Sequence, residues 1–175
     1  MKHIILVTVL LLSYLTASSQ HTYDIDFTQT KVMKVSKKTT NKVGHLVFDG
    51  KDRLSMNYSE PKGEYFIIEG NLVKVNLDGK KAEIDANKVK LVQLQRSTLL
   101  NCLSGNYEQA AIDNHAEKEI TYKGDYMIVT LTVKGKVPKG GYSSVVLTYR
   151  KSDTLLTRMV LEEAVGAINT YELKQ

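Results

Sequence analysis

Beyond about residue 20, most of the chain alternates between apolar and polar residues, which is the pattern of β-strands with one buried face. The clearest case is the segment in which Leu54, Met56 and Tyr58 take one parity and serine or asparagine takes the other. Segments of this kind, separated by turns rich in Gly, Pro, Asn and Asp, predict strands over residues 23–35, 46–48, 54–58, 65–68, 72–77, 118–122, 126–133, 144–151, 155–162 and 168–173. A sheet of about nine to eleven antiparallel strands is too long to stay flat, so we expect it to coil into a barrel or half-barrel.

One segment departs from this alternation. From about Asn87 to Ser104 the apolar residues recur at three- and four-residue spacing, which predicts an amphipathic helix capped by Asn87 and ended at Gly105. The polar stretch 106–116 fits a second short helical piece. So little helix cannot cover both sides of the sheet, and the concave side must be filled by its own side chains, by a lid or by a ligand. Composition alone is compatible with an ordinary packed core or with a ligand cavity.

The N-terminus has the features of a secretory signal peptide. Lys2 precedes an apolar run over 4–12, and small residues follow at 17–19. The run is shorter than the roughly 20 apolar residues that a transmembrane helix needs. We therefore expect residues 1–19 to be a signal peptide cleaved near Ser19, and residues 20–175 to form a single, soluble domain. No cysteine directly follows the apolar run, so we expect no N-terminal lipid attachment.

Charge and cysteine content point away from nucleic-acid binding and disulfide stabilisation. The formal net charge is +5, and basic residues crowd 31–42 and 134–139 without the interleaved aromatics of a nucleic-acid surface. These runs are interpreted as solvated faces, with docking to an acidic membrane partner as the alternative. Cys102 is the only cysteine, so no intramolecular disulfide can form, and its place in the predicted helix is typical of packing.

No constellation in the sequence indicates an enzyme or a metal protein. The three histidines beyond the signal peptide have no metal-ligand spacing and are expected at surface or edge positions: His21, His45 and His115. Two carboxylate pairs are interpreted as solvent-facing strand residues: Asp24 with Asp26, and Glu162 with Glu163. Phosphate-binding loops and nucleophile elbows are also missing from the sequence, so neither a cofactor nor a metal is expected, and the protein is predicted not to be an enzyme.

Several motifs, taken in order, resemble those of the outer-membrane lipoprotein carrier family, in particular the LolA-like variants of Bacteroidetes. The matching pieces are Phe27-Thr28-Gln29 (F-x-Q), Gly44-His45-Leu46 (G-x-L), the strand Arg53 to Pro61, the turn Ile67 to Asn71, the close of the helical stretch at Leu103-Ser104-Gly105, and Met159 to Glu163 with Gly166. Each motif is weak alone, and their order and spacing along nearly the whole mature chain carry the resemblance.

The resemblance implies an unclosed antiparallel barrel whose opening is covered by helices. It also implies a monomeric periplasmic chaperone that takes lipoproteins from an inner-membrane exporter, shields their acyl chains and releases them to an outer-membrane acceptor. The alternative is a lipid- or lipoprotein-sensing module with the same half-barrel and no transfer activity. Transposed to this sequence, with companions added on the same faces, the acyl-chain cavity would comprise Phe27, Leu46, Phe48, Leu54, Met56, Tyr58, Phe66, Ile68, Leu99, Leu100, Leu103, Met127, Val129 and Leu131.

Three departures from the family pattern stand out. The usual tryptophan of the third strand is Met56 here. In the family an arginine latches the lid, and the corresponding position in this sequence falls near Gly50. Arg53 is the nearest arginine that could substitute for it. The helix that precedes F-x-Q is nearly missing, because few residues separate the expected cleavage site from Phe27.

Overall fold

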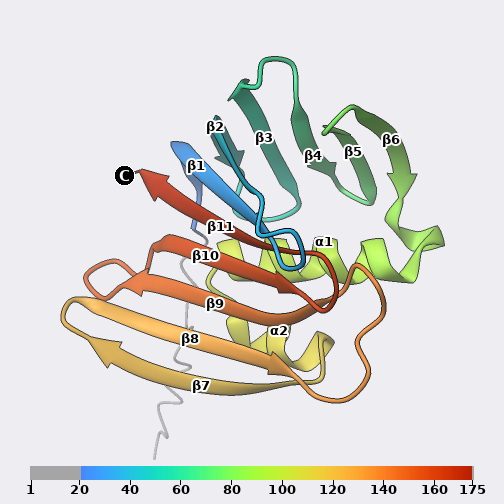
Figure 1. Ribbon diagram of the computed structural model, residues 1–175. Coiled ribbons are helices and arrows are strands. Elements are labelled where there is room, and N and C mark those ends of the chain that lie inside the picture. The colour runs from blue at the N-terminus through green and yellow to red at the C-terminus, as the bar shows by residue number, and fades with distance from the viewer. Residues whose placement is uncertain (1–20, 175) are drawn as a thin grey trace, which may run out of the picture.

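The computed structural model describes residues 21–174, and the expected signal peptide lies outside them. Within this range the chain forms one antiparallel sheet of eleven strands, in the order β6-β5-β4-β3-β2-β1-β11-β10-β9-β8-β7 (Figure 1). The strands are β1 (Tyr23–Met33), β2 (Thr39–Phe48), β3 (Arg53–Glu60), β4 (Tyr65–Glu69), β5 (Leu72–Leu77), β6 (Lys80–Asp85), β7 (Ala116–Lys123), β8 (Tyr126–Val133), β9 (Tyr142–Arg150), β10 (Leu156–Glu163) and β11 (Ala167–Lys174). β6 and β7 are the two edges, so the sheet is not closed and the predicted half-barrel is confirmed.

The first and last strands are neighbours in the middle of the sheet. β1 pairs with β11 in a register that places Phe27 opposite Leu173, and with β2 in one that places Phe27 opposite Gly44. Every other neighbouring pair is consecutive in the chain. The sheet is therefore two meanders, β1–β6 and β7–β11, joined through the β1–β11 pair.

Two helices connect the meanders and lie on one face of the sheet, which curves around them (Figure 1). α1 (Lys90–Leu103) and α2 (Tyr107–Asp113) confirm the predicted helices. The predicted cap was wrong: Asn87 belongs to the 3-10 turn η1 (Ala86–Lys88), which the Asp85 carboxylate caps by accepting a hydrogen bond from the Asn87 N–H. This extra turn moves the N-cap from Asn87 to Val89 and so delays the start of α1 by two residues. The helix ends as expected, because Gly105 has a φ of +80°.

The core lies between the concave face of the sheet and α1. Side chains of one parity from most strands, together with α1, form one buried apolar cluster, which includes Phe27, Leu46, Leu54, Leu147 and Leu103. Gly44 has a specific role here, because the Phe27 ring lies directly over it and meets Tyr58 edge-on at 5.2 Å between centroids. A Cβ at position 44 would lie 2.8 Å from the Phe27 ring and 2.5 Å from a backbone oxygen, so this packing requires glycine.

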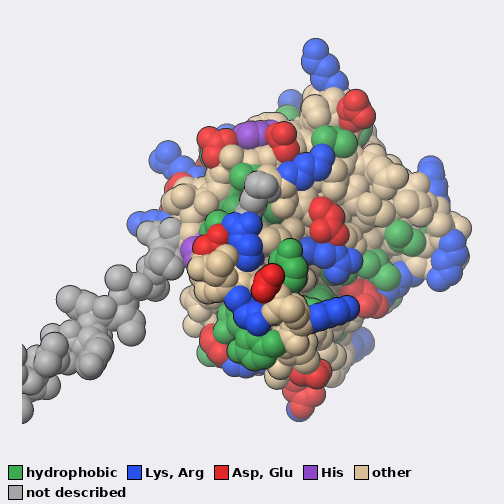
Figure 2. All heavy atoms as spheres, turned by 90° about the vertical axis from the view of Figure 1, so that its left-hand side faces the viewer, with side chains coloured by type: hydrophobic (Ala, Val, Ile, Leu, Met, Phe, Trp, Pro, Cys, Tyr) green, Lys and Arg blue, Asp and Glu red, His purple; other side chains and the backbone are tan. Residues whose placement is uncertain are grey.

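Charged side chains of both signs are interspersed over the face that Figure 2 shows. On β1 and β2 the His45 imidazole lies between two carboxylates, 2.7 Å from Asp24 and 2.8 Å from Asp26. Hydrogen bonds that the Asp26 and Asp24 carboxylates accept from its ring raise the pKa of His45. The surface position expected for these two carboxylates, for His45 and for His115 is confirmed. His21 was predicted wrongly: it is buried, beside Thr154, and burial lowers its pKa.

Candidate ligand cavity

A cavity of about 380 Å³ remains between the concave face of the sheet and α1. Its walls come from strands on both sides of the β1–β11 pair and from one helix. The lining residues are Gln29, Lys31, Lys42, Met56, Tyr58, Phe66, Val75, Leu77, Asp78, Lys80, Gln95, Leu99, Tyr142, Met159, Leu161, Glu163, Asn169 and Tyr171. The set contains an apolar group and an uncharged polar group. The polar group is Gln29, Tyr58, Tyr142 and Asn169.

The apolar group consists of side chains from four strands and α1. Met56 and Phe66 lie opposite each other on β3 and β4, and Val75 lies opposite Phe66 on β5. Leu161 comes from β10, and Leu99 faces them from α1. None of these residues carries a hydrogen-bonding side chain, so this part of the cavity suits hydrocarbon.

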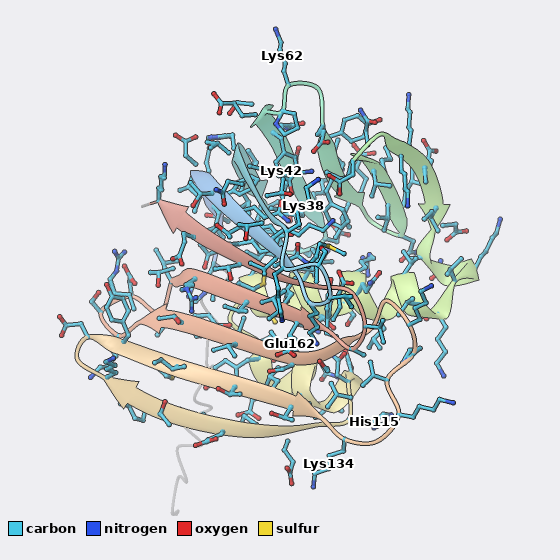
Figure 3. All side chains as sticks on the ribbon, in the orientation of Figure 1. Lys38, Lys42, Lys62, His115, Lys134 and Glu162 are labelled. Carbon is cyan, nitrogen blue, oxygen red and sulfur yellow. The ribbon has the colours of Figure 1, made fainter. Side chains whose placement is uncertain are left out.

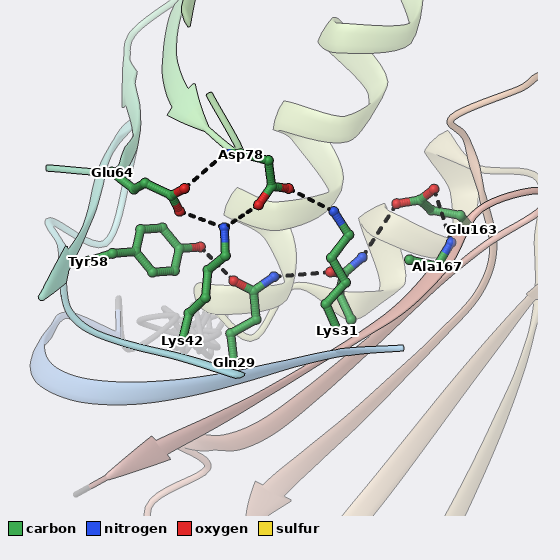
Figure 4. Close-up of polar contacts among 9 residues, drawn as sticks. Gln29, Lys31, Lys42, Tyr58, Glu64, Asp78, Glu163 and Ala167 are labelled. Carbon is green, nitrogen blue, oxygen red and sulfur yellow. Dashed lines mark hydrogen bonds and ion pairs between the residues drawn. The ribbon is translucent and has the colours of Figure 1, made fainter. Parts of the chain in front are cut away.

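The polar group includes a chain of hydrogen bonds across the middle of the sheet (Figure 4). The Tyr58 hydroxyl donates to Gln29 Oε1 at 2.9 Å, and Gln29 Nε2 donates to Asn169 Oδ1 at 3.0 Å. All three residues are buried. Burial raises the pKa of Tyr58, and it raises that of neighbouring Tyr171 to about 12, so both phenols stay neutral at physiological pH.

An ionic cluster adjoins this chain (Figure 4). Lys42 Nζ lies 2.5 Å from Glu64 Oε2 and 2.7 Å from Asp78 Oδ1, while Lys31 Nζ lies 2.9 Å from Asp78 Oδ2. Hydrogen bonds from Lys42 and then Lys31 lower the pKa of Asp78 to about 2. Burial works against the charge of Lys42, yet its bonds to Asp78 and Glu64 prevail and its pKa is raised. Lys42 and Asp78 are therefore both charged at neutral pH.

The ionic cluster corrects one prediction made from the basic run over residues 31–42. Lys42 was expected on a solvated face, but its side chain is only 3% exposed, because its parity on β2 turns it inward towards two carboxylates. Figure 3 shows the contrast with Lys62, which projects away from the molecule. The other basic run, over 134–139, contributes Lys136 and Pro138 to a second depression of about 770 Å³ on the outer side of α1.

The two glutamates expected at solvent-facing positions of β10 differ in their surroundings. Glu162 is paired with Lys34 at 2.7 Å. Glu163 instead lines the cavity, where Oε1 accepts a hydrogen bond of 3.4 Å from Asn169 Nδ2. The prediction was wrong for Glu163 because it shares the inward parity of Met159 and Leu161 on β10, which line the same cavity, whereas Glu162 has the opposite parity.

Four of the fourteen residues assigned to an acyl-chain cavity from sequence line the observed cavity: Met56, Tyr58, Phe66 and Leu99. Nine others are buried in the adjoining core: Phe27, Leu46, Phe48, Leu54, Ile68, Leu100, Leu103, Val129 and Leu131. Met127 is partly buried against that core. Sequence reasoning missed the polar lining, although one signal was available: Gln29 and Lys31 continue the parity of Phe27 along β1.

Hydrogen bonds to the sheet and its loops hold α1 over the cavity. Gln95 Nε2 donates to the Gly140 carbonyl at 2.7 Å, and Arg96 Nε donates to the carbonyl of Gly70 in the β4–β5 turn. The Tyr149 hydroxyl donates to the Cys102 carbonyl at 2.8 Å. Among residues 21–174, Arg53 forms no side-chain hydrogen bond. The arginine that joins the helical cover to the sheet is instead Arg96 of α1.

Cys102 is packed in this interface. It is fully buried, and burial raises the pKa of its thiol to about 12, as a packing role requires. Across residues 21–174, His, Cys, Asp and Glu side chains form no cluster that could hold a metal ion. The helices in the same range are too short or too polar to cross a membrane.

The family model for the outer membrane lipoprotein carrier protein LolA matches residues 18–175. The chain belongs to this family. Solved structures that it resembles include a LolA superfamily protein from Nitrosomonas europaea, at 11% identity and a TM-score of 0.41, with 90% of this chain and 86% of that chain covered. Another is the Mycobacterium tuberculosis lipoprotein LppX, at 12% identity and a TM-score of 0.39, covering 90% and 87%. A sequence comparison with curated proteins gave no match.

Proposed function

We propose that this LolA-family protein is a periplasmic carrier that shields the acyl chains of lipoproteins between an inner-membrane exporter and an outer-membrane acceptor. The observation that carries the proposal is the cavity beneath α1, with apolar residues of four strands and of the helix on its walls. The family description names a lipoprotein carrier, and the expected signal peptide would deliver the protein to the periplasm.

The cavity beneath α1, as the structure shows it, has room for one acyl chain at a time. Liquid water would place about a dozen molecules in 380 Å³, and a methylene group is of similar size. At about 0.8 kcal/mol per buried methylene, a chain that filled the whole volume would gain about 10 kcal/mol, which is an upper bound because part of the lining is polar. A triacylated cargo needs more room, so α1 must move outward as such a cargo loads.

The lining also favours release. Met56 and Met159 are unbranched and flexible, so they adapt to chains of different length without a rigid fit. α1 is held by few side-chain hydrogen bonds, of which two join it to loops: Gln95 to Gly140 and Arg96 to Gly70. The rest of its attachment is apolar burial of Leu99, Leu100 and Leu103, which an acyl chain entering beneath α1 can replace with contacts of the same kind.

Binding of a fluorescent triacylated peptide to the delipidated mature protein tests the proposal. Met56→Glu places a charge in the apolar part of the cavity and should weaken binding at least tenfold, since an acyl chain cannot solvate it. Val47→Glu is the matched control, because Val47 is 41% exposed and faces outward from β2. Far-UV circular dichroism confirms that both variants fold. Equal affinity of both variants, or no affinity of the wild type, would contradict the proposal.

Transfer separates the carrier from the sensing alternative. The loaded protein is mixed with acceptor vesicles that contain an outer-membrane lipoprotein receptor, and the labelled peptide is followed into the vesicle fraction. A carrier delivers its cargo faster than the cargo dissociates alone. Tight binding without receptor-dependent delivery would favour the sensing module.

A further inference from the structure

The polar group of the cavity is unusual for a site that holds only hydrocarbon. Gln29 and Asn169 are 7% and 9% exposed, and both line the cavity. Burying such amides is unfavourable unless their hydrogen-bonding groups are satisfied. A purely apolar wall at these positions would bind hydrocarbon without that penalty.

These side chains satisfy one another only in part. An amide NH₂ carries two donors, and Gln29 Nε2 uses one of them on Asn169. Asn169 Nδ2 uses one on Glu163, over a long 3.4 Å. Tyr142 lines the same cavity, and its hydroxyl has no hydrogen-bond partner among residues 21–174. The capacity left over therefore consists mainly of N–H and O–H donors, which suit a ligand with acceptor oxygens.

The charges around the polar group balance one another. Three lysines line the cavity: Lys31, Lys42 and Lys80. Two carboxylates line it as well, Asp78 and Glu163. A third carboxylate, Glu64, is not part of the lining but is paired with Lys42. Asp78 bridges two of the lysines, so an anionic ligand would have to displace a carboxylate already in place. The cluster offers no net positive charge to a phosphate or a free carboxylate.

We propose that the polar group binds the uncharged, oxygen-rich head of an acylated ligand, through its ester or amide carbonyls and hydroxyls, while the acyl chain extends among the apolar residues. The proposal rests on the proposed function and specifies which part of the cargo the cavity recognises. The amide donors of Gln29 and Asn169 and the Tyr142 hydroxyl bind the acceptor oxygens, and the ionic cluster disfavours charged heads.

Competition with a fluorescent acyl probe tests the proposal, with two ligands of equal chain length at pH 7.5: a monoacylglycerol and the corresponding fatty acid. The wild type should bind the monoacylglycerol about tenfold more tightly. Tyr142→Phe removes only a hydroxyl without a protein partner, so folding should be unaffected. This variant should bind the monoacylglycerol about two- to tenfold more weakly and the fatty acid unchanged, as loss of one hydrogen bond predicts. Tyr122→Phe, at a 67% exposed position, is the control.

Asn169→Leu provides a second measurement, because it removes the amide while keeping a similar volume. It should reduce the preference for the monoacylglycerol by a similar factor. Tighter binding of the fatty acid by the wild type, or an unchanged ratio of the two affinities in both variants, would overturn the headgroup proposal while leaving the carrier intact. If neither ligand nor the triacylated peptide binds, the result contradicts both the carrier function and the headgroup proposal.

Discussion

The ionic cluster makes a quantitative prediction about Asp78. Replacing it by asparagine removes the carboxylate that joins Lys31 to Lys42 and leaves the buried Lys42 with Glu64 alone. The pKa of Asp78 falls from 3.8 to about 2 in the folded protein, a difference that corresponds to about 2.4 kcal/mol. Half of the side chain is exposed, so solvent screening reduces the expected loss of unfolding free energy to about 1 kcal/mol.

The pH dependence follows from the direction of this shift. Because the folded-state pKa is depressed, the Asp78 contribution is fully present above its ordinary value of 3.8 and is lost as the pH falls through about 2. Urea unfolding of wild type and Asp78→Asn should differ by about 1 kcal/mol at pH 7 and by about half of that at pH 3. Asp125→Asn, in the exposed β7–β8 turn, should leave the unfolding free energy unchanged. A difference between wild type and Asp78→Asn that stays constant from pH 7 to pH 3 would refute the reasoning.

Two further predictions concern the core and the cover. Gly44→Ala should lower the unfolding free energy by about 1–3 kcal/mol, measured by urea unfolding, because a Cβ there overlaps the Phe27 ring and a backbone oxygen; unchanged stability would mean that the ring moves aside freely. Arg96→Ala should speed amide hydrogen exchange in α1 without changing that of the central strands, because it removes the bond to the β4–β5 turn. Equal exchange of α1 in the variant and the wild type would show that this bond does not hold the cover.

Alternation along the chain predicted most of the sheet, because burial of one face imposes a period of two on every strand. The exception is β6 (Lys80–Asp85), for which the sequence predicts no strand because it has only two apolar residues among charged ones. As an edge strand it pairs only with β5, so its sequence carries little of the burial signal. The start of β2 at Thr39 was missed for a related reason, since polar residues continue there along a paired strand.

The polar lining was beyond sequence reasoning because its partners meet only in three dimensions. Lys42 reaches Glu64 and Asp78, which are 22 and 36 positions away along the chain. Gln29 and Asn169 are 140 positions apart and meet because the first and last strands pair. Parity indicates that such residues face inward, but it does not indicate which opposite charge or amide they will find.

The two unpaired borders of the sheet bear on how the protein behaves at high concentration. An open strand is a template on which another chain can add by backbone hydrogen bonding, the first step towards fibrils. Here β6 begins with Lys80 and Lys81, and β7 carries Glu117, Lys118 and Glu119 in succession. Adding a strand to either edge would remove these charges from water, which is unfavourable. The half-barrel can therefore leave its edge strands β6 and β7 exposed at high protein concentration and still resist aggregation.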